Sequence, residues 1–520
     1  MASTFFGLTI AYTGLQASQA AINVTAHNIS NIQTPGYTKE QATTTAADAL
    51  RTYSSYGTIG AGVTVTGIDQ VRDSYYDVKY RNNMTNYGEY EAKNNYMTQI
   101  QDYLNEFTLK GYSTEYANFF SAVNQVTRTP EDESAKNQLI NNAKSMSDYF
   151  NTLSTNLRNV QVDANNEVKD AVQQINSLAQ NIAALNKQIN QIEANYGNAN
   201  DLRDKRNALL DDLSQIVNIT TDEQDLGNNL SNLTVTVNGQ MLVSGYDYNS
   251  LTTVAREDKR NASDADGLYD IKWEKTGMEF NIYSDSLGGQ LKGLIDIRDG
   301  CNGEVEKQAM NADGTPATDS DGNELYGTEG YTGYNTSFKG VPYYQSQLNQ
   351  FIATFSDAVN DILKSGVTSD GSAEGISLFV TKDGTSVMNA TNVTVNKELL
   401  EDANKLATKS EVNTGEANAD IMDKLNALQS QKIFDGGTGS YFLESIISDM
   451  SIDAKKAENF TANYKNLKTS IQNQRLSVMG VDSDEEAMDL VKFQQAYNLS
   501  SKMMSIMNQI YDKLINQTGV

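Results

Sequence analysis

The chain has 520 residues, of which 39% are hydrophobic and 20% are charged, and its formal net charge is −26. Several domains are expected, because a single hydrophobic core rarely serves more than about 250–300 residues. The negative charge argues against a nucleic-acid partner, whose phosphates would be repelled. One cysteine rules out an intramolecular disulfide, and one histidine argues against His-based catalysis or a multi-histidine metal site.

Neither a membrane span nor a secretory signal is expected. No stretch approaches the roughly 18 consecutive apolar residues that a membrane-spanning helix needs. The first basic residue is Lys39, so the N-terminus lacks the basic segment that opens a cleaved signal peptide. If the protein leaves the cell, it is expected to use another route.

The first predicted element is a helix over residues 3–33, which contains no Lys, Arg, Asp or Glu. Apolar residues recur at every seventh position along one face, namely Leu8, Leu15, Ile22 and Ile29. Two glycines weaken this helix by about 1 kcal/mol each relative to alanine, so alone in water it should be unstable. Thr34-Pro35-Gly36-Tyr37 predicts a type II turn at its end, because Pro35 presets φ and Gly36 allows a positive φ.

Residues 40–72 are predicted to be extended, and residues 73–127 mostly helical. Thr129–Asp132 predicts a helix start, with Thr129 as the N-cap and Pro130 at the first helical position. The helix that follows should reach about residue 195, because two seven-residue rows of apolar side chains run along it: Leu157, Ala164, Ala171, Leu178, Leu185 and Ile192, and Val168, Ile175, Ile182 and Ile189. An intramolecular bundle is favoured over an intermolecular coiled coil, since helices are predicted on both flanks.

A second helix is predicted over 202–217, after which the period of apolar residues changes to two. Asn238-Gly239 predicts a hairpin turn, and Tyr269–Trp273 and Phe280–Tyr283 are predicted as further strands. Residues 301–340 are rich in Gly, Asp, Asn and Thr, which indicates a loop or a surface insertion. The remaining elements are helices at 343–364, 417–434 and 440–478 and a short strand at Val393–Val395.

The last helix is predicted to open at Ser483, which would form a capping box with Glu486. Two seven-spaced rows lie along it, the second interrupted at Ser500: Leu490, Tyr497, Met504 and Tyr511, and Phe493, Met507 and Leu514. Each end of the chain thus carries a stripe to bury, which indicates that function depends on how the ends associate.

Both ends carry motifs of a known family. Ala26–Tyr37 (AHNISNIQTPGY) resembles the N-terminal signature of the axial proteins of the bacterial flagellum, which comprise rod, hook and hook-associated proteins. Ser477–Asp482 (SVMGVD), Asp484–Glu486 (DEE) and Phe493–Tyr497 (FQQAY) resemble their C-terminal signature. The continuation Thr38–Gln41 and the patterns at 175–189, 200–206 and 291–299 are more specifically similar to the hook-associated members.

The resemblance implies an α+β, multidomain, elongated protein. Its coiled-coil-like helical domains would be discontinuous, built from N- and C-terminal segments, with a central β-rich outer domain. We expect a terminal helical pair from 1–45 and 480–520 in the inner core of the axial tube. A long-helix bundle would follow from 46–225 and 343–479, a β-rich outer domain from 226–300, and a Gly/Asp-rich insertion from 301–342.

The resemblance also implies a structural role outside the cell. The chain would be exported by the flagellar type III pathway without a cleaved signal peptide and would form the hook–filament junction ring on which the filament is built. The implied partners are further copies of the chain, hook protein, a second hook-associated junction protein and a cytoplasmic export chaperone at the C-terminal helix. Neither catalysis nor a cofactor or metal is expected. The candidate assembly residues are Leu8, Leu15, Ile22, Asn28, Ile29, Asn31, Pro35, Gly36, Tyr37, Leu490, Phe493, Gln494, Tyr497, Met504, Met507, Tyr511 and Leu514.

Other readings remain open. Within the family, hook protein or a flagellin is the nearest alternative. An enzyme in residues 226–340 is disfavoured, because that segment offers no nucleophile–base pair. A surface adhesin is conceivable from its tyrosines at Tyr326, Tyr331, Tyr334, Tyr343 and Tyr344. Calcium binding at Asp319–Asn323 is disfavoured, since Glu324 and Gly330 stand where an EF-hand needs Gly and Glu.

Single residues near the two signatures allow more than one role. Asn28 and Asn31 could make assembly contacts or only bond the end of their helix. His27 is expected on a helix surface or in an interface, because no carboxylate stands near it in the sequence. Met503, Met504 and Met507 fit a packed face, which could also meet a chaperone before assembly.

Overall fold

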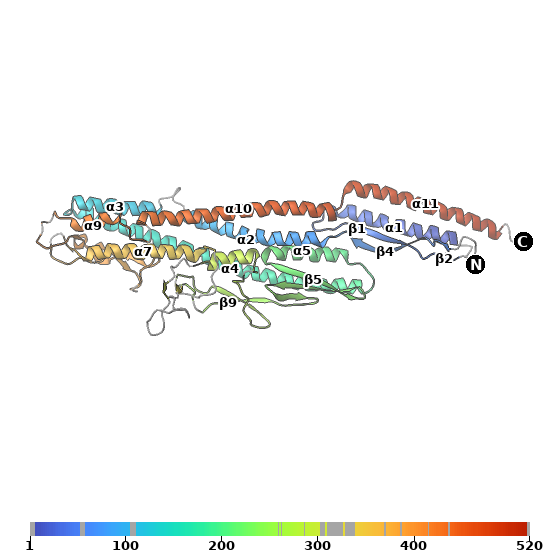
Figure 1. Cartoon of the computed structure of the whole chain (residues 1–520), viewed down its shortest axis with the longest axis horizontal. Coiled ribbons are helices and arrows are strands. Elements are labelled where there is room, and N and C mark those ends of the chain that lie inside the picture. Colours follow the sequence, from blue (N-terminus) through green and yellow to red (C-terminus); the bar gives the residue numbers. More distant parts are fainter. Residues whose placement is uncertain are drawn as a thin grey trace, which may run out of the picture. The chain divides into compact units, whose positions relative to one another are not determined.

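The computed structural model describes residues 6–51, 58–104, 111–257, 259–261, 263–284, 286–301, 307–308, 326–327, 338–368, 371–384, 387–413, 415, 417–434 and 437–516. Helices predominate and are joined by small antiparallel sheets, so the α+β expectation is confirmed (Figure 1). The chain divides into two compact units. The terminal unit comprises Met1–Thr85, Ile175–Ser250 and Tyr464–Val520, and the central unit comprises Asn86–Gln174 and Leu251–Asn463. The four-part division expected from the sequence stays a prediction.

Three long helices contribute residues to both units. They are α2 (Ser74–Leu104), α4 (Glu133–Glu193) and α10 (Gly439–Met479). In α4 the apolar row from Val168 to Ile189 is fully buried, whereas Ile192 of the neighbouring row is 41% exposed. The predicted length of this helix is confirmed, and its buried row packs within the chain, as favoured for an intramolecular bundle.

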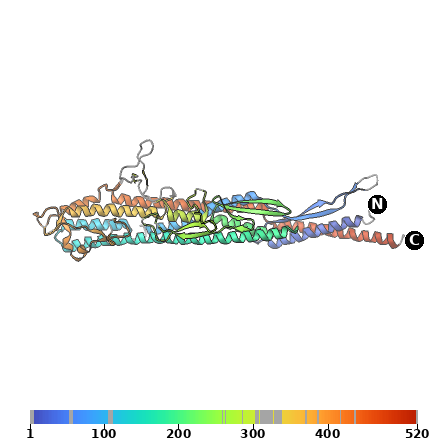
Figure 2. The ribbon, with the colours of Figure 1, turned by 90° about the horizontal axis from the view of Figure 1, so that it is seen from below.

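In the terminal unit the first and last helices pack together. Helix α1 (Phe6–Asn31) lies along α11 (Ser483–Asn516) and against a ribbon of β1 (Glu40–Ala46) and β4 (Val63–Gln70), as Figures 1 and 2 show. The ribbon is antiparallel, with a bulge between Thr43 and Thr44. A short pair, β2 (Leu50–Arg51) and β3 (Thr58–Ile59), extends the same hairpin.

The terminal unit also holds α5 (Asn200–Ile216) and a four-stranded antiparallel sheet. Its strands, in sheet order, are β5 (Ile219–Gly227), β6 (Leu230–Val237), β7 (Gln240–Ser244) and β8 (Asp247–Tyr248). The hairpin predicted at Asn238-Gly239 is confirmed: Val237 pairs with Gln240, and both turn residues have positive φ, 50° and 78°.

The central unit has an aromatic core between helices. Its helices are α3 (Tyr112–Arg128), α6 (Gly289–Asp299), α7 (Val341–Lys364), α8 (Lys397–Glu401), the 3₁₀ turn η1 (Ala403–Lys405) and α9 (Asp420–Leu428). Its strands pair as β9 (Leu251–Ala255) with β10 (Tyr269–Trp273), β13 (Val367–Thr368) with β16 (Ala407–Lys409), and β14 (Phe379–Thr381) with β15 (Val393–Val395). Phe355 of α7 stacks on Phe351 at 5.6 Å and meets Phe119 of α3 edge-on at 5.5 Å.

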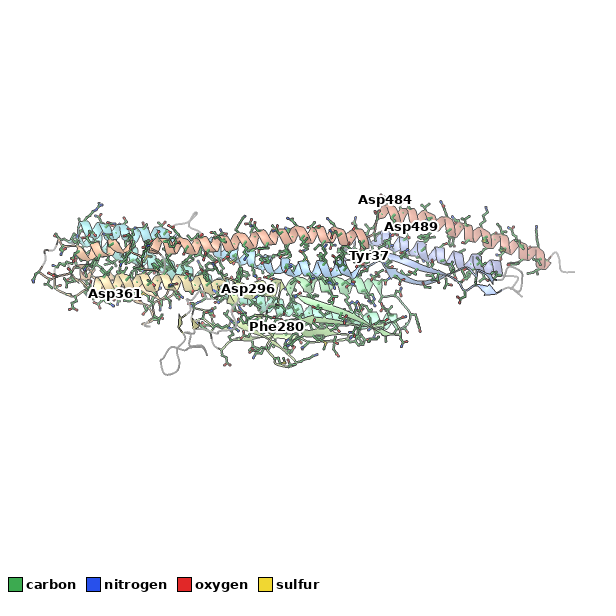
Figure 3. The ribbon with its side chains drawn as sticks, viewed as in Figure 1. Tyr37, Phe280, Asp296, Asp361, Asp484 and Asp489 are labelled. Atoms are coloured by element: carbon green, nitrogen blue, oxygen red, sulfur yellow. The ribbon has the colours of Figure 1, made fainter. Side chains whose placement is uncertain are left out.

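The segment 226–300, expected to be β-rich, also contains a helix and lacks one of the expected strands. Residues 289–299 form helix α6, and Phe280–Tyr283 does not form a strand. Phe280 still bonds to β10 through its N–H to the Ile271 carbonyl at 2.9 Å (Figure 3). The next residues leave the ladder because the Asn281 side chain accepts from the Tyr283 N–H at 3.1 Å, which closes a local turn. Most of 301–342 and the acidic loop at 319–330 lie outside the described residues, apart from β11 (Lys307–Gln308) pairing with β12 (Tyr326–Gly327).

The predicted start of α4 is wrong by a few residues, whereas α11 begins at Ser483 as predicted but with a different cap. Helix α4 begins at Glu133, and the Asp132 carboxylate accepts from the Ser134 N–H at 2.9 Å, while Thr129 caps the end of α3. At α11 the cap is Asp482, whose carboxylate accepts from the N–H groups of Asp484 and Glu485 at 2.8 and 3.2 Å. In both places a carboxylate takes the cap that a hydroxyl was expected to hold, because the helix N-terminus favours negative charge.

Helix α9 is also shorter than the 417–434 expected. After Leu428 the backbone bonds change to the three-residue spacing of turns, as in the bond from the Ser430 N–H to the Ala427 carbonyl at 3.1 Å.

A capping experiment separates the two candidates at α11. Asp482→Ala should destabilise the first turn by about 1 kcal/mol, because two N–H groups lose their acceptor. Faster amide hydrogen exchange at Asp484 and Glu485 would show this. Ser483→Ala is the control and should leave those rates unchanged; a larger effect from Ser483→Ala would restore the original assignment.

A buried ion-pair cluster gives the central unit a defined acid sensitivity. Asp299 is 7% exposed, and its carboxylate pairs with the guanidinium groups of Arg298 and Arg256. The two Arg256 Nη atoms donate to its oxygens at 2.9 and 2.7 Å. Burial alone would raise the pKa of Asp299, but the two guanidinium groups outweigh it and hold the pKa below its usual range.

Because the folded pKa is depressed, this carboxylate stabilises the fold above its unfolded value of about 3.9, and the effect is lost as the pH falls below that value. Asp299→Asn should therefore lower the thermal midpoint at pH 7 and reduce its loss between pH 5 and 3. Asp361→Asn, at an exposed position of α7, should leave both unchanged (Figure 3). Parallel pH curves for wild type and Asp299→Asn would contradict this.

Candidate assembly site at the two chain ends

The turn after α1 sends the chain back along the helix. The Thr34 carbonyl accepts from the Tyr37 N–H at 3.2 Å, and Gly36 has φ +80°. The type II turn predicted at Pro35-Gly36 is therefore confirmed. A side chain at residue 36 would be strained, because L-residues rarely adopt that φ.

Asn28 ties this turn to the last helix. Its Nδ2 donates to the Glu40 carbonyl at 2.9 Å and to Glu486 Oε1 at 3.1 Å. Its Oδ1 accepts from the Tyr37 hydroxyl at 2.8 Å and the Glu40 N–H at 3.0 Å. A side-chain amide that is 1% exposed thus has both donors and both acceptor positions in use. Asn28 is an internal link between α1, β1 and α11.

Asn31 has a more local role. Its Nδ2 donates to the His27 carbonyl at 3.1 Å, and its Oδ1 accepts from the Thr34 hydroxyl at 3.1 Å. These bonds close the end of α1, as in the helix-end alternative raised from the sequence.

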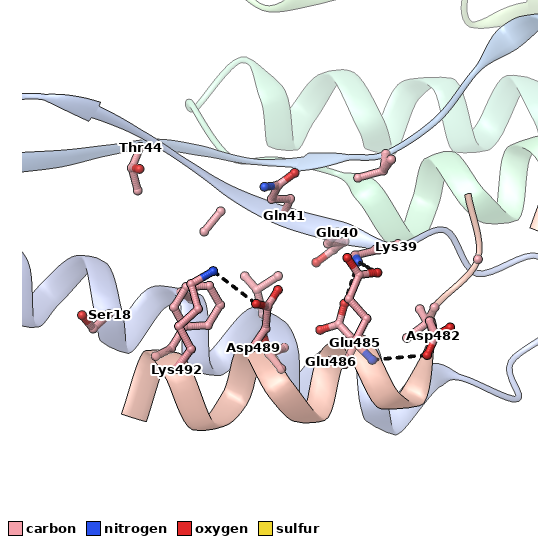
Figure 4. A pocket seen from close by; sticks show the side chains of 18 of the residues that line it. Ser18, Lys39, Glu40, Gln41, Thr44, Asp482, Glu485, Glu486, Asp489 and Lys492 are labelled. Carbon is pink, nitrogen blue, oxygen red and sulfur yellow. Dashed lines mark hydrogen bonds and ion pairs between the residues drawn. The ribbon is translucent and has the colours of Figure 1, made fainter. Parts of the chain in front are cut away.

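Charged groups complete the link to α11. Lys39 Nζ lies 2.8 Å from Glu485 and 3.3 Å from Glu486, which is 2% exposed (Figure 4). The Lys39 N–H donates to the Met479 carbonyl at 2.8 Å. Burial opposes the charge on Lys39, but hydrogen bonds to Glu485 and Glu486 outweigh it and raise the lysine pKa. Burial and the carboxylates around Tyr37 raise the pKa of that phenol, so its hydroxyl stays protonated and can donate to Asn28.

A second cluster of charged residues fixes Thr38 to three helices that come later in the sequence, α2, α5 and α10. Asp204 accepts from the Thr38 N–H and hydroxyl, both at 2.8 Å, and Arg72 pairs with Asp204 at 3.0 Å and with Asp77 at 2.7 Å. Arg475 of α10 joins the same cluster through Asp77 at 2.8 Å. Sequence reasoning singled out the segment around Asp204 only as a family pattern; its partners lie far away in the sequence.

An open cavity of about 930 Å³ lies between α1, β1 and α11 (Figure 4). Small side chains of α1, among them Ala17 and Ala21, line it on one side, and β1 and α11 line the others. Lys492 and Asp489 lie at its edge, 3.4 Å apart.

The predicted stripe of α1 is only partly buried. Leu8, Leu15 and Ile22 are half-buried and Ile29 is 38% exposed, whereas the row between them, Ala11, Ser18 and Thr25, is buried. Helices α1 and α11 approach closely where α1 has glycine: a methyl group added at Gly14 would lie 3.1 Å from Ser500 Oγ. Sequence reasoning treated these glycines only as weak points; a glycine opposite a small residue is the signal for close packing.

On α11 most of the predicted residues are at least half-buried. Leu490, Phe493, Tyr497, Met504 and Met507 are half-buried, Tyr511 is buried, and Gln494 and Leu514 are exposed. Sequence reasoning missed most of the outward side. Large apolar side chains there, which we call the outer row, are 44–69% exposed: Met488, Val491, Leu499, Met503, Ile506, Ile510 and Leu514. An apolar pattern around more than one stripe was the available signal.

Other candidate groups are accounted for as follows. Of the adhesin tyrosines, Tyr344 is fully buried and the Tyr343 hydroxyl donates to Asp449 at 2.9 Å; the side chains of the other three lie outside the described residues. His27 lies 3.5 Å from Asp201, a carboxylate that its sequence neighbourhood did not reveal. In the part of the chain that the structure describes, His27, Glu40 and Asp201 are the grouping that could hold a metal ion. None of the described helices combines the length and apolar character needed to cross a membrane.

A family model described as the flagellar hook-associated protein FlgK helical domain matches residues 97–379, more than half of the 520 residues. The chain belongs to this family. The two signature segments match further models, "Flagella basal body rod protein" at residues 8–38 and "Flagellar basal body rod FlgEFG protein C-terminal" at residues 472–517. The resemblance to flagellar axial proteins is thereby confirmed, together with its hook-associated character.

Relatives align over nearly the whole chain. Flagellar hook-associated protein 1 of Bacillus subtilis is 28% identical over 535 residues, covering 100% of this chain and 99% of that protein. Its namesake in Escherichia coli is 28% identical and covers 97% and 98%. The solved hook junction protein FlgK of Burkholderia pseudomallei has a TM-score of 0.58 at 15% identity over 77% of this chain and all of that one, which shows a shared fold.

The link made by Asn28 can be tested by removing it. Asn28→Ala leaves the Glu40 N–H and the Tyr37 hydroxyl without their buried partner, and Glu486 keeps only Lys39. Unfolding should therefore cost about 2–3 kcal/mol less, measured by denaturant titration. Asn23→Ala removes an exposed asparagine from the same helix and should cost within about 0.5 kcal/mol. Equal effects of the two variants would contradict the assigned role.

Proposed function

We propose that this chain is a non-catalytic structural adaptor that forms the hook–filament junction ring on which the filament is built. Its family and the names of its relatives support a hook-associated role. The observation that carries the proposal is the outer row of α11, seven large apolar side chains that this chain leaves exposed.

The size of the outer row argues for permanent partners. Fully burying one Leu, Ile, Val or Met is worth about 1.5–3 kcal/mol, so covering even half of the row offers a large driving force for assembly. Soluble monomers rarely expose contiguous apolar patches of this kind. The partners we propose are further copies of the chain, hook protein on one side and a second hook-associated junction protein on the other.

The candidate assembly residues divide into two groups under this proposal. One group holds the turn, α1 and α11 in place inside the terminal unit and so positions the outer row: Asn28, Asn31, Pro35, Gly36 and Tyr37. Leu514 and the exposed part of the α1 stripe, including Ile29, would meet neighbours directly together with the outer row.

Export before folding is consistent with the composition of the ends. Helix α1 carries no charge and contains glycine, so it is costly to form alone and gains its stability from α11. No disulfide within the chain can obstruct threading, since there is one cysteine. We propose export by the flagellar type III pathway without a cleaved signal peptide, with a cytoplasmic chaperone covering the outer row until export.

Replacement of apolar side chains in the outer row tests the proposal. A strain lacking the gene should make hooks without filaments and lose flagellin to the medium, and wild-type protein should restore filaments. The double variant Leu499→Asp, Ile506→Asp should fail to restore them, because two carboxylates cannot be buried in an apolar contact.

The matched control is Asn498→Asp, Ser501→Asp, which adds the same charge at exposed polar positions of the same helix and should restore filaments. Circular dichroism of the purified variants checks that both fold. Normal filaments with the Leu499 and Ile506 double variant, or in the deletion strain itself, would refute the proposed function.

A further inference from the structure

Three potential metal ligands converge from three elements of the terminal unit. His27 lies in the last turn of α1, Glu40 opens β1, and Asp201 lies in the first turn of α5. One ligand atom from each lies within 4.8 Å of the other two, and His27 Nε2 is 3.5 Å from Asp201 Oδ1. The fold, and not the local sequence, brings them together.

Two groups stabilise the charge of Glu40: the Asn200 side chain donates to its carboxylate, and His27 lies nearby. Glu40 is 9% exposed, yet no ion pair among the described residues gives Glu40 or Asp201 a lysine or arginine partner. A carboxylate with little exposure is stabilised by a nearby positive charge. An ion between the three side chains would supply that charge.

The histidine is held in a suitable position. The Tyr37 ring contacts the imidazole edge-on at 5.6 Å and 70°, and the end of α1 at Asn31 places the negative pole of the helix beside the cluster. The negative pole of the helix favours a cation beside the imidazole. The Asn31 amide nitrogen lies 3.5 Å from Nε2, so it would turn aside when an ion binds there. Asp201 is 61% exposed, so its side chain can rotate to close the remaining distance, while Glu40 and His27 stay in place.

We propose that His27, Glu40 and Asp201 form a binding site for a divalent transition-metal ion. One imidazole and two carboxylates suit zinc and similar first-row ions, with water in the fourth position. Calcium and magnesium fit less well, since they prefer oxygen ligands only. Bound metal would clamp the end of α1 to β1 and α5, beside the link that Asn28 makes, and would stabilise the terminal unit in proportion to metal occupancy.

Zinc titration of the full-length protein tests the site. The protein is first treated with EDTA and desalted, and zinc binding is followed by calorimetry. We expect one zinc ion per chain, with at least about tenfold weaker binding for His27→Ala, Glu40→Gln and Asp201→Asn. Asp247→Asn, at an exposed acid of the same unit, is the matched control and should bind as wild type does.

The single histidine provides a second, local readout. With 13C-labelled histidine, the one imidazole resonance should shift or broaden on addition of cobalt(II), and Asp201→Asn should weaken this response. Because Asp201 is exposed, its variant keeps the fold even if His27→Ala does not. An imidazole resonance that ignores cobalt, or zinc binding unchanged in Asp201→Asn, would overturn the proposal.

Discussion

The terminal unit depends on one buried amide, that of Asn28. Each polar atom of a buried amide must find a partner, and here the partners come from the turn, from β1 and from α11. The bonds to Glu40 and Tyr37 are local, but the bond to Glu486 requires the other end of the chain. Without α11, Asn28 would keep an unsatisfied donor, so the first signature motif is fully satisfied only when the last helix is in place.

Close helix packing and ion pairs surround the Asn28 amide. Small residues of α1 let α11 approach, as at Gly14 and Ser500, and the approach brings Lys39 to Glu485 and Glu486. The residue before Lys39, Thr38, is fixed to helices α2, α5 and α10 by the cluster of Asp204, Arg72, Asp77 and Arg475. The short stretch of residues 38–40 after the turn is therefore tied to α1, α5 and α11. The residues after the turn are polar because each of them bonds to another element, whereas helix α1 before them has no charged residue and packs through small side chains.

What the sequence predicted well is what local chemistry determines. The turn at Pro35-Gly36, the hairpin at Asn238-Gly239, the long helix to Glu193 and the strand at Tyr269–Trp273 all follow from φ preferences or periodicity. The errors arise where two local options compete. A carboxylate displaced the expected hydroxyl at the caps of α4 and α11, and the Asn281 side chain turned the chain out of its expected strand. The site itself could be named only in part, because the partners of Asn28, Asp204 and His27 lie far along the chain and nothing local specifies them.

The negative charge of the chain restricts the surfaces through which copies can associate. With a net charge of −26, two copies repel each other at a distance, although salt near physiological strength screens this beyond about 8 Å. Contact therefore favours surfaces where charge is sparse and apolar area is large. Helix α1 has no charged residue, and the outer row of α11 supplies the apolar area. Repulsion elsewhere on the surface opposes other pairings, so the charge favours the proposed association through the two chain ends.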